Sequence, residues 1–426
     1  MSVTGDVTER RWSRVELAAF RFGFAYALLF FPIQLVSRLP LFTWVDDLWN
    51  GAWACVVPWV ARHVFRIARG FPDTSEGLGD FRYSYARVAC VALFAAVVAV
   101  MWTVLDRSAR DHRRLREWLE VLVRYGLANA MLFYGFAKIF EHQFTGPSLE
   151  LLAQPYGDQS AQDVLWNFMG VSRPYTIFGG LAECVGGLLL LDRRTTTLGA
   201  LVIAAVMTNV VMLDFSYDVP VKLYSSHILV MALFLASTDA RRLASVLVLQ
   251  QPTEPGPLPP HFVQPRWERA RRVVKVVFVL YLTTANLHRL LIEAWASPDL
   301  TPKPALYGIW EVSSCVRSVT WRRFVIDRAF ADPSHVAVTI WHLDGTRERL
   351  RGTEDDARRT LRLEAWKDDE AKAQLSYARV DDDHLVFTTE GDGAATPIEL
   401  QRRDEGSFRL TQRHFRWSVG DSGWRH

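Results

Sequence analysis

The sequence predicts an α-helical integral membrane bundle of about seven transmembrane helices, followed by an all-β soluble domain. Two observations support this fold class. Long apolar runs fill the chain up to about residue 293, and short runs of alternating apolar and polar residues follow from about residue 305. Half of the 426 residues are hydrophobic, yet the mean hydropathy is close to zero, because the average combines two unlike regions.

Seven segments are long and apolar enough to be considered as spans, since a bilayer core takes roughly 20 apolar residues in a helix. The polar stretches 192–197 and 214–220 separate the shorter fourth, fifth and sixth segments. The seven segments lie at about residues 17–36, 86–105, 119–140, 174–191, 196–213, 221–238 and 273–293.

Arginine and lysine residues gather in every second connection. They precede the first segment, and they lie between the second and third, the fourth and fifth, and the sixth and seventh segments. Short cytoplasmic loops carry an excess of these residues, so the basic connections are expected on the cytoplasmic side. The sequence therefore predicts a multi-pass protein of the plasma (inner) membrane, with a cytoplasmic N-terminus and an extracytoplasmic C-terminal domain.

These segments divide the chain into five parts. Within the first part, the Trp-rich loop 37–85, which contains Pro58, suits an amphipathic helix lying in the membrane interface. The parts are two helices with this loop (1–118), a four-helix core (119–240), a Pro-rich cytoplasmic linker (241–272), a seventh helix (273–293) and the β domain (305–426).

The C-terminal domain alternates with period two, which is typical of short antiparallel strands. The runs are HVAVTIWHL, QLSYARV, HLVFTTE, PIELQRR and SFRLTQRHFRWS, with turns at 381–383 and 391–393. The domain resembles a lipocalin, in which a Gly-x-Trp on the first strand lies under a late arginine. On that resemblance Gly308 and Trp310 match, with Arg413 or Arg416 as the covering arginine. A closed barrel and another all-β form remain equally open.

Six polar residues stand within or beside the apolar segments of the core, where a charge costs about 2.5–3.5 kcal/mol on insertion scales. Glu183 is the deepest, so a partner or a function is favoured for it. Gly179, Gly180, Gly186 and Gly187 surround Glu183 in sequence and permit close helix packing. The six candidate pocket residues are Lys138, Glu183, Asn209, Asp218, Lys222 and His227.

Simpler structural roles compete for most of these residues. Asp218 suits the N-cap of the sixth helix, and Asp214 suits a solvated loop. Lys138 and Lys222 could extend to the interface. His227 could be a neutral polar partner between helices.

At these residues the chain resembles the DoxX-like family of integral membrane proteins. The motifs are YGFAKIF, FGGLAECVGGLLLLDRRTTT and DVPVKLYSSHIL, within residues 119–240. The resemblance implies a four-helix core, and some family members are subunits of a thiosulfate:quinone oxidoreductase. The extra helices and the β domain depart from the minimal family. The matching positions are Lys138, Glu183, Gly186, Gly187, Arg194 and Thr195.

Three functions are compatible with these observations. The first is a component of a quinone-linked membrane redox system, in which the polar residues bind the quinone and a redox partner protein supplies electrons. No cofactor motif is evident, so catalytic residues are not assigned and enzyme activity stays open. The second is a lipid or apolar small-molecule binding or transfer protein that uses the β barrel. The third is a structural membrane scaffold.

Charge and cysteine content narrow the partners. The net charge of +3 gives no argument for nucleic acid, which leaves the lipid bilayer, a quinone or lipid ligand and a partner protein. The four cysteines are scattered without a CxxC pair, so no metal site is expected. Whether Cys55 and Cys315 form a disulfide is left open by the sequence.

Overall fold

The computed structural model divides into two compact units. The helical unit contains Met1–Phe136 and Gly180–Leu287, and the barrel unit contains Ala137–Gly179 and His288–His426. The structure describes residues 11–30, 43–66, 82–109, 111–254, 264–295, 303–315, 320–328, 335–365, 371–389 and 396–411.

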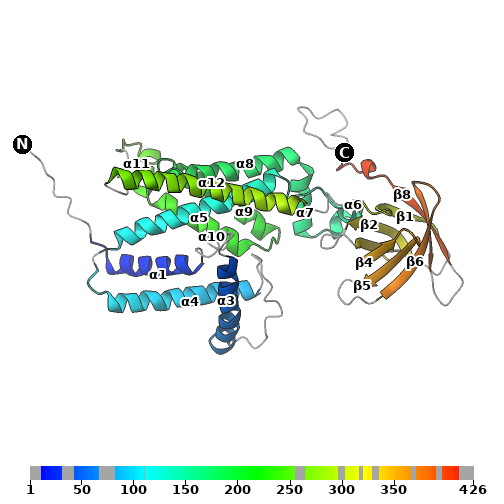
Figure 1. Ribbon diagram of the computed structural model, residues 1–426, viewed down its shortest axis with the longest axis horizontal. Helices are drawn as coiled ribbons and strands as arrows, with labels where there is room; N and C mark the ends of the chain where they lie inside the picture. Colours follow the sequence, from blue (N-terminus) through cyan, green and yellow to red (C-terminus); the bar gives the residue numbers. More distant parts are fainter. Residues whose placement is uncertain are drawn as a thin grey trace, which may run out of the picture. The chain divides into compact units, whose positions relative to one another are not determined.

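Every segment predicted to span the membrane contains an α-helix (Figure 1). Helices α5, α8 and α12 each run from one unit into the other. The seven helices are α1 (Arg14–Phe30), α4 (Arg82–Leu105), α5 (Arg113–Ile139), α8 (Arg173–Leu190), α9 (Thr196–Ser216), α10 (Lys222–Ser237) and α12 (Pro265–Trp295).

By length and composition, two helices in the described part of the chain are apolar enough to cross a membrane. They are α4 and α9. Helix α10 and the short α11 (Ala240–Leu247) pass the same test together, although a bend of 75° separates them. The count of seven spans therefore stays a prediction, while the helices themselves are present.

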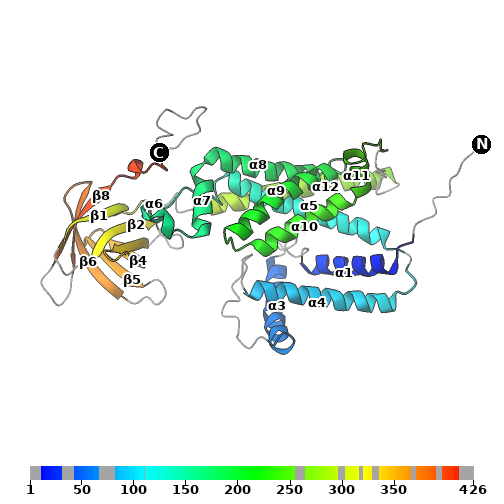
Figure 2. The same cartoon turned by 180° about the vertical axis from the view of Figure 1, so that it is seen from behind.

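Helices α1, α5, α8, α9 and α10 share one apolar core. Leu127 and Met131 of α5, Ile203 of α9 and Leu235 of α10 are among its fully buried side chains. A second cluster joins α1 and α4 to α3 (Thr43–His63), which contains Pro58 and crosses α4 at a steep angle in both views (Figures 1 and 2). The predicted interfacial segment is thus a helix lying across the bundle direction.

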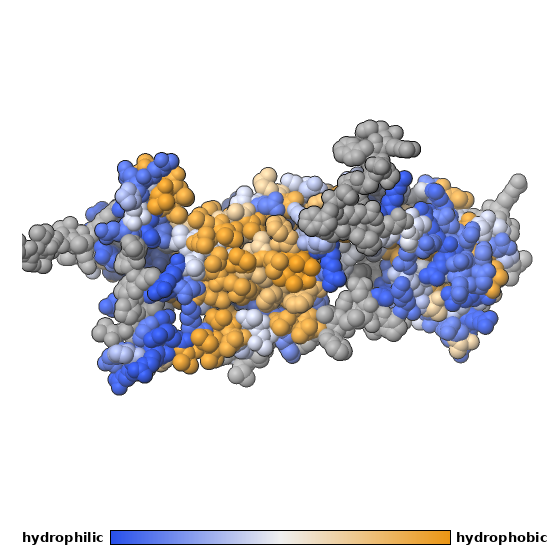
Figure 3. Space-filling model, turned by 90° about the horizontal axis from the view of Figure 1, so that it is seen from above, coloured by the Kyte–Doolittle hydropathy of each residue, from blue (hydrophilic) through white to orange (hydrophobic). Residues whose placement is uncertain are grey.

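The basic connections lie at one end of the helical unit. The start of α1, the end of α4, the start of α5, α11 and the start of α12 lie together there (Figures 1 and 2). Lys275 Nζ of α12 lies 3.9 Å from Asp192 in the α8–α9 turn, which adds Arg193 and Arg194 to this end. Beyond it, apolar side chains form a broad band on the face shown in Figure 3.

The β domain is a closed barrel, which decides between the closed barrel and the other all-β form that the sequence left equally open. Eight antiparallel strands follow one another around it, and β1 pairs with β8 to close the sheet. The strands are β1 (Gly308–Cys315), β2 (Trp321–Arg328), β3 (Val336–His342), β4 (Arg347–Asp355), β5 (Thr360–Ala365), β6 (Ala371–Arg379), β7 (His384–Thr389) and β8 (Pro397–Arg403).

The prediction of a last strand in the run SFRLTQRHFRWS is wrong for residues 407–411, the part of the run that the structure describes. Pro397–Arg403 is the closing strand, and a 3₁₀ turn η3 (Glu405–Ser407) follows it. Because the sheet closes at β8, the arginine over Trp310 is its neighbour across the strands, Arg402, with the guanidinium carbon 5.9 Å from the ring centre. Arg413, Arg416 and the predicted turn at 391–393 lie outside the described residues.

Alternation along the strands fills the barrel interior with large apolar side chains. Trp310, Phe324 and Phe387 have no accessible surface, and Trp310 donates its indole N–H to Leu306 O at 2.9 Å. A Cβ on Gly352 would lie 2.7 Å from a methyl group of Val336. The described strands therefore enclose a dry, closely packed core.

Candidate functional site

Among the described residues of the helical unit, Glu183 is the most deeply buried carboxylate, with 2 % of its surface exposed. It stands in the middle of α8, where glycines bring helices together: Gly187 faces Ala128 O of α5, and Gly186 faces Ile203 of α9. This burial keeps water from the carboxylate, so its charge state depends on polar groups of the protein.

Asp214 is buried as well, which corrects the prediction of a solvated loop acid. Helix α9 continues to Ser216, beyond the predicted end at residue 213, and so carries Asp214 in its last turn. In the turn that follows, Val219 N donates a hydrogen bond to Asp214 O at 3.1 Å. The described part of the helical unit thus has buried acids at the centre of α8 and at the end of α9.

His227 lies in an aromatic stack between α10 and α1. Its ring is parallel to that of Phe30, with centroids 4.1 Å apart, and Tyr26 Oη lies 2.7 Å from its Nε2. Its Nδ1 lies 2.6 Å from Leu223 O, a geometry in which Nδ1 donates and Nε2 accepts from Tyr26. Both ring nitrogens are therefore engaged within the bundle.

Asp218 and Lys222 form an ion pair at 3.6 Å across the α9–α10 turn. Asp218 does not cap α10, because the helix begins at Lys222 with Val221 at the N-cap position, and Asp218 instead adopts a left-handed φ of 54°. Its side chain is 85 % exposed. Asn209 lies on an exposed face of α9.

Lys138 is buried near the end of α5, in the barrel unit. Its Nζ lies 5.9 Å from the centre of the Phe144 ring, a cation–π distance. Among the six predicted residues, one described contact joins Asp218 to Lys222. Glu183, Asn209 and His227 stand on α8, α9 and α10 of the helical unit.

A buried arginine cluster near the basic end was not predicted from the sequence. Arg21 Nε donates to His112 Nε2 at 3.1 Å, and its two terminal nitrogens donate to Thr103 Oγ1 and Asp106 O. Burial, together with the charge of Arg21, lowers the pKa of His112. Arg21 near the start of the first predicted span was the available signal, but its partners lie at the end of α4 and in the connection that follows.

A pair of asparagines was also missed. Asn286 of α12 donates its amide N–H to Asn129 Oδ1 of α5 at 2.9 Å, and both side chains are buried. The pair joins the seventh predicted helix to the four-helix core.

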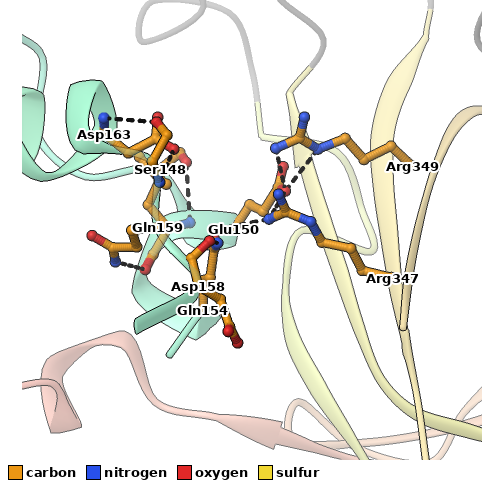
Figure 4. Close-up of polar contacts among 10 residues, drawn as sticks. Ser148, Glu150, Gln154, Asp158, Gln159, Asp163, Arg347 and Arg349 are labelled. Atoms are coloured by element: carbon orange, nitrogen blue, oxygen red, sulfur yellow. Dashed lines mark hydrogen bonds and ion pairs between the residues drawn. The ribbon is translucent and has the colours of Figure 1, made fainter. Parts of the chain in front are cut away.

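The barrel unit has its own polar joint, formed by the connection between α5 and α8. This connection contains α6 (Leu149–Ala153), η1 (Tyr156–Asp158) and α7 (Ala161–Val171). Glu150 of α6 points at Arg347 and Arg349 of β4, with Arg347 also donating to Gln154 Oε1 at 2.8 Å (Figure 4). The polar contacts thus attach α6 to the barrel wall.

Apolar contacts complete this joint. Ile309, Val325 and Trp341 point outward from β1, β2 and β3 and are buried against Leu149 and Ala153 of α6. Both ends of α6 are also fixed. Leu149 N donates to Asp327 Oδ2 at 3.2 Å, and Arg323 Nη1 donates to Ala153 O at 2.7 Å.

Within the described residues, no group of three or more His, Cys, Asp and Glu side chains is placed to hold a metal ion. Cys55 is an exposed thiol on α3, and the side chain of Cys315 lies outside the described residues.

Comparison with curated proteins finds the uncharacterized protein YwoB of Bacillus subtilis (strain 168), which is 28% identical over 145 residues. The match covers 34% of this chain and 91% of that protein. About a third of the chain therefore resembles a nearly complete bacterial protein. No family model and no solved structure matches the chain.

Proposed function

We propose that the chain is a multi-pass protein of the plasma (inner) membrane, in which α1, α4, α5, α8, α9, α10 and α12 cross the bilayer. The apolar band on the helical unit and the gathering of basic connections at one end support this arrangement. Helices α5, α8 and α12 have their other ends in the barrel unit, which would make the barrel extracytoplasmic.

We further propose that the helical unit is a DoxX-like component of a quinone-linked redox system. The observation that carries this proposal is the burial of Glu183 in the centre of α8. A carboxylate at this depth is costly in a membrane and is therefore a candidate proton carrier. Reducing a quinone to a quinol takes up electrons and protons together. A redox partner protein would supply the electrons, and Glu183 would pass the protons.

The surroundings of the other candidates refine the proposed site. A quinone oxygen would have to displace Tyr26 or the Leu223 carbonyl before it could bind His227, so His227 is better suited to holding α1 against α10. Asn209 and Asp218 are exposed, which favours Glu183, with buried Lys138, as the first residues to test.

The alternative of lipid or small-molecule transfer through the barrel receives less support. An interior cavity that held a ligand would give its lining side chains accessible surface. The central side chains of the described strands, among them Trp310 and Phe324, have none. A lipid ligand, if the protein carries one, is therefore better sought in the helical unit.

The test is to identify what co-purifies with the full chain. We expect a quinone whose absorbance changes on reduction, and Glu183→Gln should lower its amount while leaving the thermal unfolding midpoint of the protein near that of the parent. Asp218→Asn, at an exposed carboxylate, serves as the control and should retain the quinone.

Other results would point elsewhere. A bound phospholipid in place of quinone would favour the transfer protein. No bound compound, with a lowered unfolding midpoint for Glu183→Gln, would favour the scaffold and reject the redox proposal.

A further inference from the structure

Helix α11 is amphipathic, and neither of its faces is covered. Arg241, Arg242 and Ser245 share one side at helical spacing, and Leu243, Val246 and Leu247 share the other. All eight residues of α11 are described, and none of them is buried. Leu243 is half-buried, whereas Val246 is 51 % and Leu247 69 % exposed, so the outer part of the apolar side is uncovered by the residues that the structure describes.

Helix α11 points in a different direction from the helices of the bundle. It leaves α10 at a bend of 75°, while α10 packs along α9, a helix long and apolar enough to cross a membrane. With α9 and α10 along the membrane normal, α11 lies close to the membrane plane. This orientation is typical of helices that bury one face at the headgroup boundary.

Basic residues surround α11 at the basic end of the helical unit. Thr197 Oγ1 donates to Asp239 Oδ2, which brings the α8–α9 turn with Arg194 beside the start of α11. Three acids near α11 are engaged with other bases: Asp239 with Arg242, Asp192 with Lys275, and Glu268 with Arg271.

Two arginines remain available to an outside partner. Arg194 and Arg241 are exposed, and no ion pair of either occurs among the residues that the structure describes. The surface therefore presents positive charge beside an uncovered apolar stripe. A lipid leaflet with anionic headgroups offers both matching features, phosphate at the surface and acyl chains beneath it.

We propose that α11, together with Arg194 and Arg241, docks on the anionic headgroups of the adjoining membrane leaflet. Val246 and Leu247 enter the acyl boundary, and the two arginines contact lipid phosphates. This inference rests on the proposed membrane-spanning arrangement and adds to it a preference for anionic lipid on the side of the basic connections.

The experiment uses the full chain, purified in detergent and stripped of lipid. Native mass spectrometry measures how tightly the protein binds phosphatidylglycerol and phosphatidylcholine. We expect preference for phosphatidylglycerol. Arg194→Gln with Arg241→Gln should weaken binding of phosphatidylglycerol about five-fold per arginine, and so about 25-fold together. Val246→Ser with Leu247→Ser should weaken binding of both lipids.

The matched control removes two exposed arginines from the barrel, Arg322→Gln with Arg358→Gln, and should leave lipid binding unchanged. Equal binding of the two lipids by the parent, or the same loss in the control as in the test variant, would overturn the proposal. An alkaline carbonate wash of membranes distinguishes failure of the lipid-docking proposal from failure of the membrane-spanning proposal. Protein that stays in the membrane without lipid preference rejects the α11 surface alone, and protein that is released rejects the spanning arrangement.

Discussion

Glu150 Oε1 of α6 lies 2.7 Å from Nη2 of Arg349 on strand β4. This ion pair joins the connection between α5 and α8 to the barrel, although the two residues are far apart in sequence. The chain leaves the barrel unit through α8 and re-enters it through α12. In the proposed arrangement α8, α9, α10 and α12 each cross the bilayer, and this even number of crossings would return the chain to the side from which it left.

The first prediction concerns this topology. Alkaline phosphatase, which is active only in an oxidising extracytoplasmic compartment, should be active when fused after Asp158 or after the last residue. It should be inactive when fused after Gln251, between α11 and α12. An active fusion at Gln251 with an inactive one at Asp158 would invert the topology.

The second prediction concerns the α6 joint. Replacing Glu150 with Ala should speed hydrogen exchange at the α6 amides, because the helix loses its ion pairs with Arg347 and Arg349. A double-mutant cycle with Arg349→Ala should give a coupling of about 0.5–1 kcal/mol, since the pair is partly solvated. Glu348→Ala on the same strand is the control, and additive effects in the cycle would contradict the pairing.

The third prediction concerns the contact of α5 with α8. A Cβ at Gly135 would meet Cys184 Sγ and lie 2.7 Å from Gly180 O. Gly135→Ala should therefore destabilise the protein by about 1–3 kcal/mol, the usual cost of overpacking. At Gly126 on the same helix the nearest atom is Met231 Cε at 3.8 Å, so Gly126→Ala should be neutral or stabilising. Thermal unfolding in detergent measures both, and equal midpoints would exclude the close contact.

The fourth prediction concerns acid stability of the barrel. Burial opposes ionisation of Glu311, but hydrogen bonds and charge from Arg323 and Arg403 outweigh it and hold the pKa of Glu311 below its usual value. A carboxyl with a lowered pKa stabilises the fold above its unfolded pKa of about 4.3, and that stability is lost as the pH falls below it.

Glu311→Gln should thus make barrel stability less sensitive to pH below about 5. Chemical unfolding at several pH values, followed by tryptophan fluorescence, measures the slope. Glu399→Gln, an exposed change on the neighbouring strand β8, should keep the slope of the parent. A Glu311→Gln slope equal to that of the parent would rule out this role for the two arginines.

The fifth prediction concerns the pair formed by Tyr26 and His227. Tyr26→Phe removes the donor to His227 Nε2 and should cost about 0.5–1.5 kcal/mol, because a half-buried acceptor loses its partner. Adding His227→Phe should recover part of that cost, since the ring can still stack on Phe30. A double variant no more stable than expected from the sum of the two single changes would contradict this account.

Periodicity was enough to predict the position of the main helices and an all-β domain after them, but it did not decide whether the sheet closes into a barrel. The ends of elements were harder, because they depend on local competition between helix and turn. Helix α9 runs three residues past the predicted end, so Asp214 is buried, and α10 begins after Pro220, so Asp218 is exposed. The barrel closes one run earlier than predicted, and the arginine that the described structure places over Trp310 is Arg402.

The candidate site could be predicted only in part. Burial of Glu183 follows from its place in a long apolar segment. The partners of Arg21, which include His112, come from a connection about ninety residues away, and hydrophobic pattern gives no information on such pairs. The same holds for Asn129 with Asn286. Side-chain partnerships between distant helices require three-dimensional structure.

Pairing of β1 with β8 leaves the described sheet without an open hydrogen-bonding edge. The described sheet of one copy consequently offers no strand onto which a strand of another copy can add. Such a domain can be present at high concentration without edge-to-edge polymerisation, and association between copies would have to use side chains of its outer wall.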